Sequence, residues 1–283
     1  MTKALMRAPR AVEGKVADRG AKRPPARSRI MSRVLANGVP LLVVVVWYFA
    51  AQNQPEYLLP APLEVAKSLK EMLIGNLADQ TFISMVRIVL AVVIAMAIGA
   101  VLTLIAHLLP VVDGLFGSRL LPFVNAVPSV GWAILGVIWL GVSDGAVVFV
   151  VVLILLPFSM VTLREGLRAI DPELREMGRS FTRRRYLVAL KVELPLLFPY
   201  ALAAARLSFS VGWKVAIIAE FFGAERGLGL VMNQARQNFQ TETVFASILA
   251  VVTIVFVVDH LVFDPLGRLA SRRSGTLVEE RNN

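Results

Sequence analysis

Long apolar segments dominate this sequence and restrict the folds that are open to it. Six of them are each near the roughly 20 residues that an α-helix needs to cross the hydrocarbon of a bilayer. They lie at about 34–51, 82–109, 121–140, 146–163, 195–222 and 244–263. Of the 283 residues, 57% are hydrophobic and 18% are charged, against about 45–50% and about 25% in ordinary soluble domains. We therefore expect an all-α integral membrane protein with six transmembrane helices.

The distribution of basic residues predicts the side of the membrane on which each loop lies. With a cytoplasmic N-terminus, twenty-three of the 30 Lys and Arg residues fall in cytoplasmic segments and four in outer loops. The other three, Arg87, Arg206 and Lys214, lie within the spans. This bias places both termini in the cytoplasm. It also accounts for the net charge of +10 without a nucleic-acid partner.

The chain divides into two tails and one membrane domain. Residues 1–33 are rich in Arg, Lys, Pro and Gly and lack periodicity, so we expect a disordered, basic cytoplasmic tail there. A transmembrane domain at 34–266 and a cytoplasmic C-terminal tail at 267–283 follow. Between the first two spans, helical spacing predicts a short amphipathic helix along the outer surface. Its apolar positions are Leu63, Ala66, Leu69, Met72 and Leu73.

The residue inventory argues against an enzyme. Cysteine is absent, which excludes disulfides, thiolate metal clusters and a cysteine nucleophile. The two histidines, His107 and His260, are far apart in sequence and lack carboxylate-rich surroundings, so we expect no metal site. No GxxxxGK[ST] motif occurs, so ATP is not bound by that route. We predict no catalytic residue and no cofactor bound by this chain.

The cytoplasmic loop at 164–195, between the fourth and fifth spans, is the most informative segment. Asp171-Pro172-Glu173 is a strong helix start, because Asp caps free N–H groups and Pro is tolerated at the first helical position. Leu174, Met177 and Phe181 follow at i, i+3 and i+7 among many Arg residues. Such an amphipathic helix needs a partner. The alternative is a solvated linker that only obeys the positive-inside rule.

The same loop resembles the EAA loop of bacterial ABC importer permeases. That family's pattern is Glu-Ala-Ala, three residues, Gly, nine residues, Ile, one residue and Leu-Pro. The matching positions are Glu176, Val192 in place of Ile, Leu194 and Pro195, and the departures are Met177, Gly178 and Thr182. Segments 59–65, 84–87, 219–224 and 227–229 are similar to the nitrate, sulfonate and taurine branch of the family. The resemblance covers roughly residues 55–265.

The resemblance implies a division of labour in the bacterial inner membrane. Two copies of the permease form the path, and a pair of cytoplasmic ATP-binding subunits uses ATP and Mg. A periplasmic or lipid-anchored solute-binding protein delivers the solute, and membrane lipid surrounds the spans. The helix from Pro172 to Tyr186 is then a coupling helix that inserts into the ATPase. The implied coupling residues are Glu176, Met177, Gly178, Phe181, Thr182, Arg183, Arg184 and Tyr186.

Charged residues inside spans are functional candidates by default. Arg87 and Glu220 lie at similar depth, so they form an ion pair between helices or contact solute. Lys214 either snorkels or donates a hydrogen bond to carbonyl groups of a broken helix, or it lines the path as a cation for an anionic solute. Pro122, Pro128 and Gly131 predict an irregular third span, which is tolerated at depth beside a water-filled cavity or packed protein. The candidate path residues are Lys214, Glu220, Arg87, Asn125, Ser129 and Trp132.

The leading prediction is a permease subunit of an ABC importer that carries a small anion such as a sulfonate, taurine or nitrate. The first alternative is the same machinery with a flavin, a thiamine precursor or another aromatic cargo, which Phe123, Trp132 and Trp213 could stack. The second is a proton-coupled carrier with Lys214 and Glu220 as its relay, although no internal repeat is visible. A membrane-embedded enzyme lacks a recognisable constellation of catalytic residues.

Overall fold

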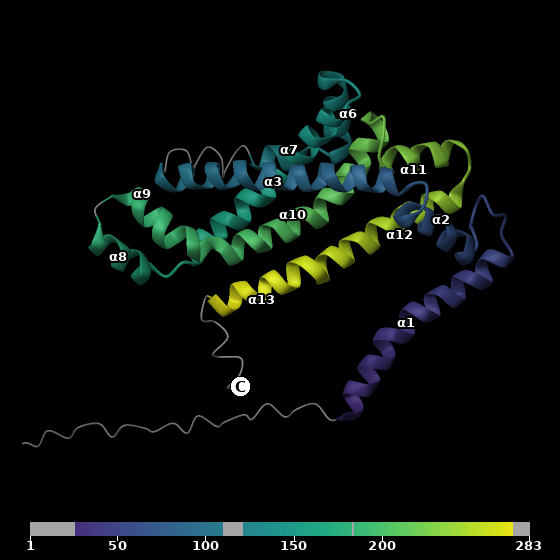
Figure 1. Cartoon of the computed structure of the whole chain (residues 1–283), viewed down its shortest axis with the longest axis horizontal. Coiled ribbons are helices and arrows are strands. Elements are labelled where there is room, and N and C mark those ends of the chain that lie inside the picture. The colour runs from purple at the N-terminus through teal and green to yellow at the C-terminus, as the bar shows by residue number, and fades with distance from the viewer. Residues whose placement is uncertain (1–25, 110–120, 183, 274–283) are drawn as a thin grey trace, which may run out of the picture.

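The computed structural model describes residues 26–109, 121–182 and 184–273, and every regular element in these residues is helical (Figure 1). The first half contains α1 (Ala26–Gln52), α2 (Pro62–Ile74), α3 (Ala78–Leu108), α5 (Leu121–Ala126), α6 (Ser129–Leu140) and α7 (Asp144–Ala169). The second half contains α8 (Pro172–Phe181), α9 (Arg185–Val188), the π-helical turn η2 (Ala189–Glu193), α10 (Leu194–Gly223), α11 (Leu228–Gln237), α12 (Thr241–Val258), the π-helical turn η3 (Asp259–Phe263) and α13 (Asp264–Arg273).

Four continuous helical segments, some of which join several of these elements, are long and apolar enough to cross a membrane. They cover Ala78–His107, Asp144–Ala169, Tyr186–Gly223 and Thr241–Ala270. At the first and third expected spans the apolar helices are shorter, at Leu41–Gln52 and Ser129–Leu140. The all-helical membrane architecture is therefore confirmed, while the six-span count and the sidedness of the termini stay predictions.

The core is built around α7, which packs against α3 on one side and α10 on the other. Small residues allow the helices to approach closely. At Gly166 of α7, a Cβ atom would lie 2.5 Å from Cγ of Tyr200 on α10, so a larger residue would force these helices apart. Ser159 of α7 donates a hydrogen bond of 3.1 Å to the carbonyl oxygen of Ala95 on α3. These contacts position α3 and α10, which carry the buried Arg87 and Glu220, against α7.

The N-terminal helix projects away from this core (Figure 1). It begins at Ala26, eight residues before the expected span at 34–51, and its apolar side chains from Leu41 to Val46 are exposed. Its outer end is held by Trp47, whose Nε1 donates to the carbonyl oxygen of Pro60 at 3.1 Å. Residues 1–25 of the expected tail, and 274–283 of the C-terminal tail, lie outside the described residues. Residues 267–273 of that tail belong to α13.

The predicted surface helix is α2, but its buried face differs from the expected one. Val65 and Met72 are fully buried, and α2 packs mainly against α12. Leu63 and Ala66 are exposed, so the expected stripe was wrong in its first turn. The reason is packing: Val65 and Met72, seven residues apart, project from one helix face, and that face meets α12.

Candidate functional site

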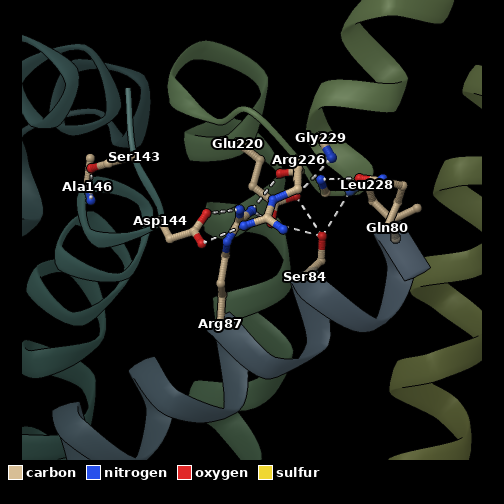
Figure 2. Close-up of polar contacts among 11 residues, drawn as sticks. Gln80, Ser84, Arg87, Ser143, Asp144, Ala146, Glu220, Arg226, Leu228 and Gly229 are labelled. Atoms are coloured by element: carbon tan, nitrogen blue, oxygen red, sulfur yellow. Dashed lines mark hydrogen bonds and ion pairs between the residues drawn. The ribbon is translucent and has the colours of Figure 1, made fainter. Parts of the chain in front are cut away.

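A cluster of charged side chains joins α3 and α10 at the end of the helices that the charge bias assigns to the outer side (Figure 2). Arg87 on α3 is 4% exposed and Glu220 on α10 is 0% exposed. Nη1 of Arg87 lies 2.7 Å from Oε1 of Glu220. Of the two roles that their similar depth left open, an ion pair between helices or contact with solute, the structure shows the ion pair. It spans 133 residues of sequence and fastens two long apolar helices together.

The buried carboxylate of Glu220 has further hydrogen-bond donors. The hydroxyl of Ser84 donates to both of its oxygens, at 2.8 and 2.7 Å. The backbone N–H of Gly229 donates to Oε2 at 2.9 Å. A buried carboxylate is costly unless it is paired and its lone pairs are occupied, and here both conditions are met. The carboxylate is thus held in place by donors from two other helices, α3 and α11.

The corner between α10 and α11 supplies three successive N–H groups to this cluster. Gly227 donates to Oε1 of Gln80 at 2.7 Å, and Leu228 donates to the hydroxyl of Ser84 at 2.9 Å. Gly227 has a φ of +115°, a conformation that favours glycine. At Gly229, an added Cβ would lie 2.4 Å from Cβ of Glu220. The corner's two glycines are therefore required by backbone conformation and by close approach to the carboxylate.

Asp144, the first residue of α7, completes the cluster, and sequence reasoning missed it. Nη2 of Arg87 pairs with its Oδ1, and Nη2 of Arg226 lies 3.6 Å from its Oδ2. Nη1 of Arg87 also donates to the carbonyl oxygen of Arg226 at 2.7 Å. The available signal was the position of Asp144 at the outer start of an apolar run, at the depth expected for Arg87. Asp144 ties α7 to the pair formed by α3 and α10.

The other two cations of the spans have different environments. Nη2 of Arg206 lies 2.5 Å from Oδ2 of Asp259 and 3.1 Å from Oδ1 of Asp264, which sequence reasoning did not anticipate. Lys214 is exposed on α10, and it makes no ion pair with any residue that the structure describes. It is six residues from Glu220 on α10 but is not part of the outer cluster. A proton relay from Lys214 to Glu220 would therefore not run through a direct contact between the two side chains.

The third apolar segment is broken, as its prolines suggested. The α5 helix ends at Ala126, and α6 begins at Ser129 after Pro128. Trp132 bridges the break, because its Nε1 donates to the carbonyl oxygen of Val124 at 3.2 Å. Asn125 is exposed, and the side chains of Ser129 and Trp132 are half-buried. No described contact joins Asn125 to Lys214.

The cytoplasmic loop forms the helix whose start the sequence predicted. The α8 helix begins at Pro172, and the side chain of Asp171 accepts a hydrogen bond of 2.9 Å from the N–H of Glu173. The expectation that it continues to Tyr186 was wrong, because α8 ends at Phe181. Thr182 is extended, and its hydroxyl accepts from the N–H of Arg184 at 3.3 Å. This hydroxyl bond offers the backbone an alternative to a further helical turn.

Two faces of α8 differ in their surroundings. Gly178 is buried against α9 and η2: an added Cβ would lie 3.1 Å from methyl groups of both Val188 and Val192. Elsewhere on the helix, Met177 is 54% exposed and Phe181 is 84% exposed. Glu176 is also exposed.

The side chains beyond α8 complete the loop. Nη1 of Arg184 donates to the hydroxyl of Tyr186 at 3.2 Å, and Arg183 lies outside the described residues. Where the loop rejoins the spans, Oε2 of Glu193 in η2 lies 3.3 Å from Nε2 of His107 on α3. The loop is therefore packed onto the spans at its base and presents an apolar tip.

Comparison with known proteins assigns this arrangement to transport. The sequence profile of one family, described as the binding-protein-dependent transport system inner membrane component, matches residues 114–263. The aliphatic sulfonates transport permease protein SsuC of Bacillus subtilis is 25% identical over 248 residues, which cover 87% of each chain. The taurine transport system permease protein TauC of Escherichia coli is 26% identical over 234 residues, covering 80% of this chain and 84% of TauC.

Among solved structures, the fold is similar to a chain of the inward-facing MetNI methionine ABC transporter. The TM-score is 0.60 at 17% identity, and the match covers 71% of this chain and 98% of that one. At this identity the likeness concerns the fold.

Proposed function

The chain belongs to the family of binding-protein-dependent transport system inner membrane components, and we propose that it carries a small solute bearing a sulfonate or similar oxyanion. It is the multi-pass permease subunit of an ABC importer in the bacterial inner membrane. The names of its relatives, aliphatic sulfonate and taurine permeases, support this cargo class. The proposed path lies between two copies of the chain.

Lys214 carries the cargo proposal. The chain places three cations within its apolar spans, and acids compensate two of them: Arg87 pairs with Asp144 and Glu220, and Arg206 has two aspartates. Lys214 is exposed and has no acidic partner in the described part of the chain. A cation at membrane depth is costly unless an anion or water accompanies it. A passing oxyanion would supply that partner, so we assign Lys214 to the path.

The aromatic alternative has less support. Trp213, one of three candidate stacking residues, is 0% exposed and packs edge-on against Phe209 with ring centroids 6.3 Å apart. It belongs to the core and does not face a path. Trp132 is held by its hydrogen bond to the backbone of α5. Phe123, 65% exposed, is the single candidate of the three without such a constraint.

We assign α8 to ATPase docking. Met177 and Phe181 form an exposed apolar tip, and Glu176 lies beside them on the same helix. The buried face at Gly178 packs against α9 and η2, which continue directly into α10, so a displacement of α8 is carried into the span. The proposed partners are a pair of cytoplasmic ATP-binding subunits and a solute-binding protein on the outer face. ATP and Mg belong to the ATPase subunits.

The experiment is ATP-driven uptake of labelled taurine by proteoliposomes that contain the permease, its ATPase and its binding protein. Lys214→Met should lower uptake about tenfold, which equals about 1.4 kcal/mol of lost anion stabilisation. Lys214→Arg keeps the charge and serves as the matched control, with uptake near that of the unchanged protein. Equal uptake by Lys214→Met and Lys214→Arg would show that the charge does not act on the cargo.

A further inference from the structure

An apolar groove lies between α3 and α7, directly beside the outer polar cluster. Its volume is about 670 Å³. Leu90, Ile94 and Ile98 line it from α3, and Val148, Val152 and Leu156 line it from α7. Arg87 and Asp144 border the groove at one end. The described residues leave the groove open, since Leu90 is 48% exposed and Phe149 is 39% exposed.

The depth of the groove matches one leaflet of a bilayer. From Arg87 to Ile98 on α3, and from Asp144 to Leu156 on α7, the helices rise by about 17 and about 18 Å at 1.5 Å per residue. Half of the hydrocarbon thickness is about 15 Å. If a transmembrane helix occupied the groove instead, it would require a complementary surface over the full thickness of the bilayer. A groove one leaflet deep, which starts at charged residues, fits an acyl chain whose headgroup lies at those residues.

The charges at the mouth specify the headgroup. Asp144 and Arg226 have side chains 56% and 61% exposed, and Nη2 of Arg226 lies 3.6 Å from Oδ2 of Asp144. Arg87 is buried and already shared between Glu220 and Asp144. The accessible cation is Arg226, which does not line the groove itself but pairs with Asp144 at its border. Adjacent exposed charges of opposite sign complement a headgroup that carries a phosphate and a primary ammonium group.

We propose that the groove binds one outer-leaflet phospholipid with a phosphate and ammonium headgroup, of the phosphatidylethanolamine class. The acyl chain lies between α3 and α7, the phosphate contacts Arg226 and the ammonium contacts Asp144. The site adds a fixed lipid to the surface of the outer cluster. Its existence does not depend on which solute the permease carries.

Native mass spectrometry of the full chain with its ATPase partner tests the site, with phosphatidylethanolamine and phosphatidylglycerol of matched chains as probes. Arg226→Gln should weaken phosphatidylethanolamine binding about fivefold, because a basic residue near a headgroup is worth about 1 kcal/mol. Lys70→Gln, an exposed outer cation on α2, is its control. Leu90→Trp should abolish lipid retention by filling the groove. Val93→Trp, on the same helix but outside the groove, should not.

Three results would overturn the proposal. One is equal lipid retention by Leu90→Trp and Val93→Trp, and another is equal affinity of the unchanged protein for the two lipids. The third concerns the alternative occupant, the exposed α1 helix of a second copy. Because the chain has no cysteine, Val44→Cys combined with Leu90→Cys reports this directly. A disulfide-linked dimer at this pair would place a helix in the groove instead of a lipid. If Leu90→Trp fails to fold, the proposal is still tested by the lipid affinity of Arg226→Gln against that of Lys70→Gln, and by the cysteine pair.

Discussion

Replacing Glu220 by Ala should cost about 3 kcal/mol of stability. The change removes the acceptor of Arg87, of the Ser84 hydroxyl and of the Gly229 N–H. Removing one partner of a buried ion pair typically costs about 3–5 kcal/mol. The lower end applies here, because Asp144 still pairs with Arg87 after the substitution. The loss is therefore smaller than for a cation left with no acid at all.

Titration with sodium dodecyl sulfate in mixed micelles, followed by far-ultraviolet circular dichroism, measures this loss. Glu225→Ala is the matched control, since Glu225 is an exposed acid five residues further along the chain. Glu220→Gln keeps the shape and one acceptor oxygen but loses the charge. It should fall between Glu220→Ala and the unchanged protein. If Glu220→Ala and Glu225→Ala unfold at the same detergent concentration, the view that the outer cluster stabilises the helix bundle is refuted.

Two further substitutions test the corner and the cytoplasmic loop. Gly229→Ala should destabilise the protein by about 1–3 kcal/mol in the same titration, because its methyl group would overlap the side chain of Glu220 and overpacking costs about that much. Gly145→Ala, where the nearest atom is 3.8 Å away, is the control, and equal midpoints would contradict the packing argument. Glu176→Lys should prevent co-purification of the ATPase while leaving chromatographic behaviour of the permease unchanged. Retained ATPase and normal uptake would remove α8 as the docking element.

The sequence predicted those parts of the site that depend on local spacing or on membrane depth. The start of α8 followed from one capping aspartate and one proline, both of which act within a single turn. The pairing of Arg87 with Glu220 followed from depth alone, since two opposite charges at one level of a helical bundle have few other partners. The start of α8 was confirmed, and of the two roles left open for Arg87 and Glu220 the structure shows the ion pair.

Contacts set by packing between distant segments were not predicted. Asp259 and Asp264 approach Arg206 because η3 and α13 pack beside α10, and no periodicity in one segment encodes that neighbour. The end of α8 at Phe181 was missed because Thr182 supplies a hydroxyl bond to the next turn. Gly178 was treated as a departure from the family pattern, and only its contact with Val188 and Val192 gives it a physical role.

One helix, α10, links these features and suggests where movement is absorbed. Its 30 residues extend about 45 Å at 1.5 Å per residue, from the base of the cytoplasmic loop, past Lys214, to Glu220. Pro199 lies inside it near the cytoplasmic end, and an internal proline removes a backbone donor and favours bending. A displacement of α8 should therefore bend α10 at Pro199 before it reaches the outer cluster. Pro199→Ala should lower taurine uptake per ATP hydrolysed and leave the detergent midpoint unchanged or higher. If the taurine uptake per ATP hydrolysed is unchanged, α10 moves as a rigid body and does not bend at Pro199.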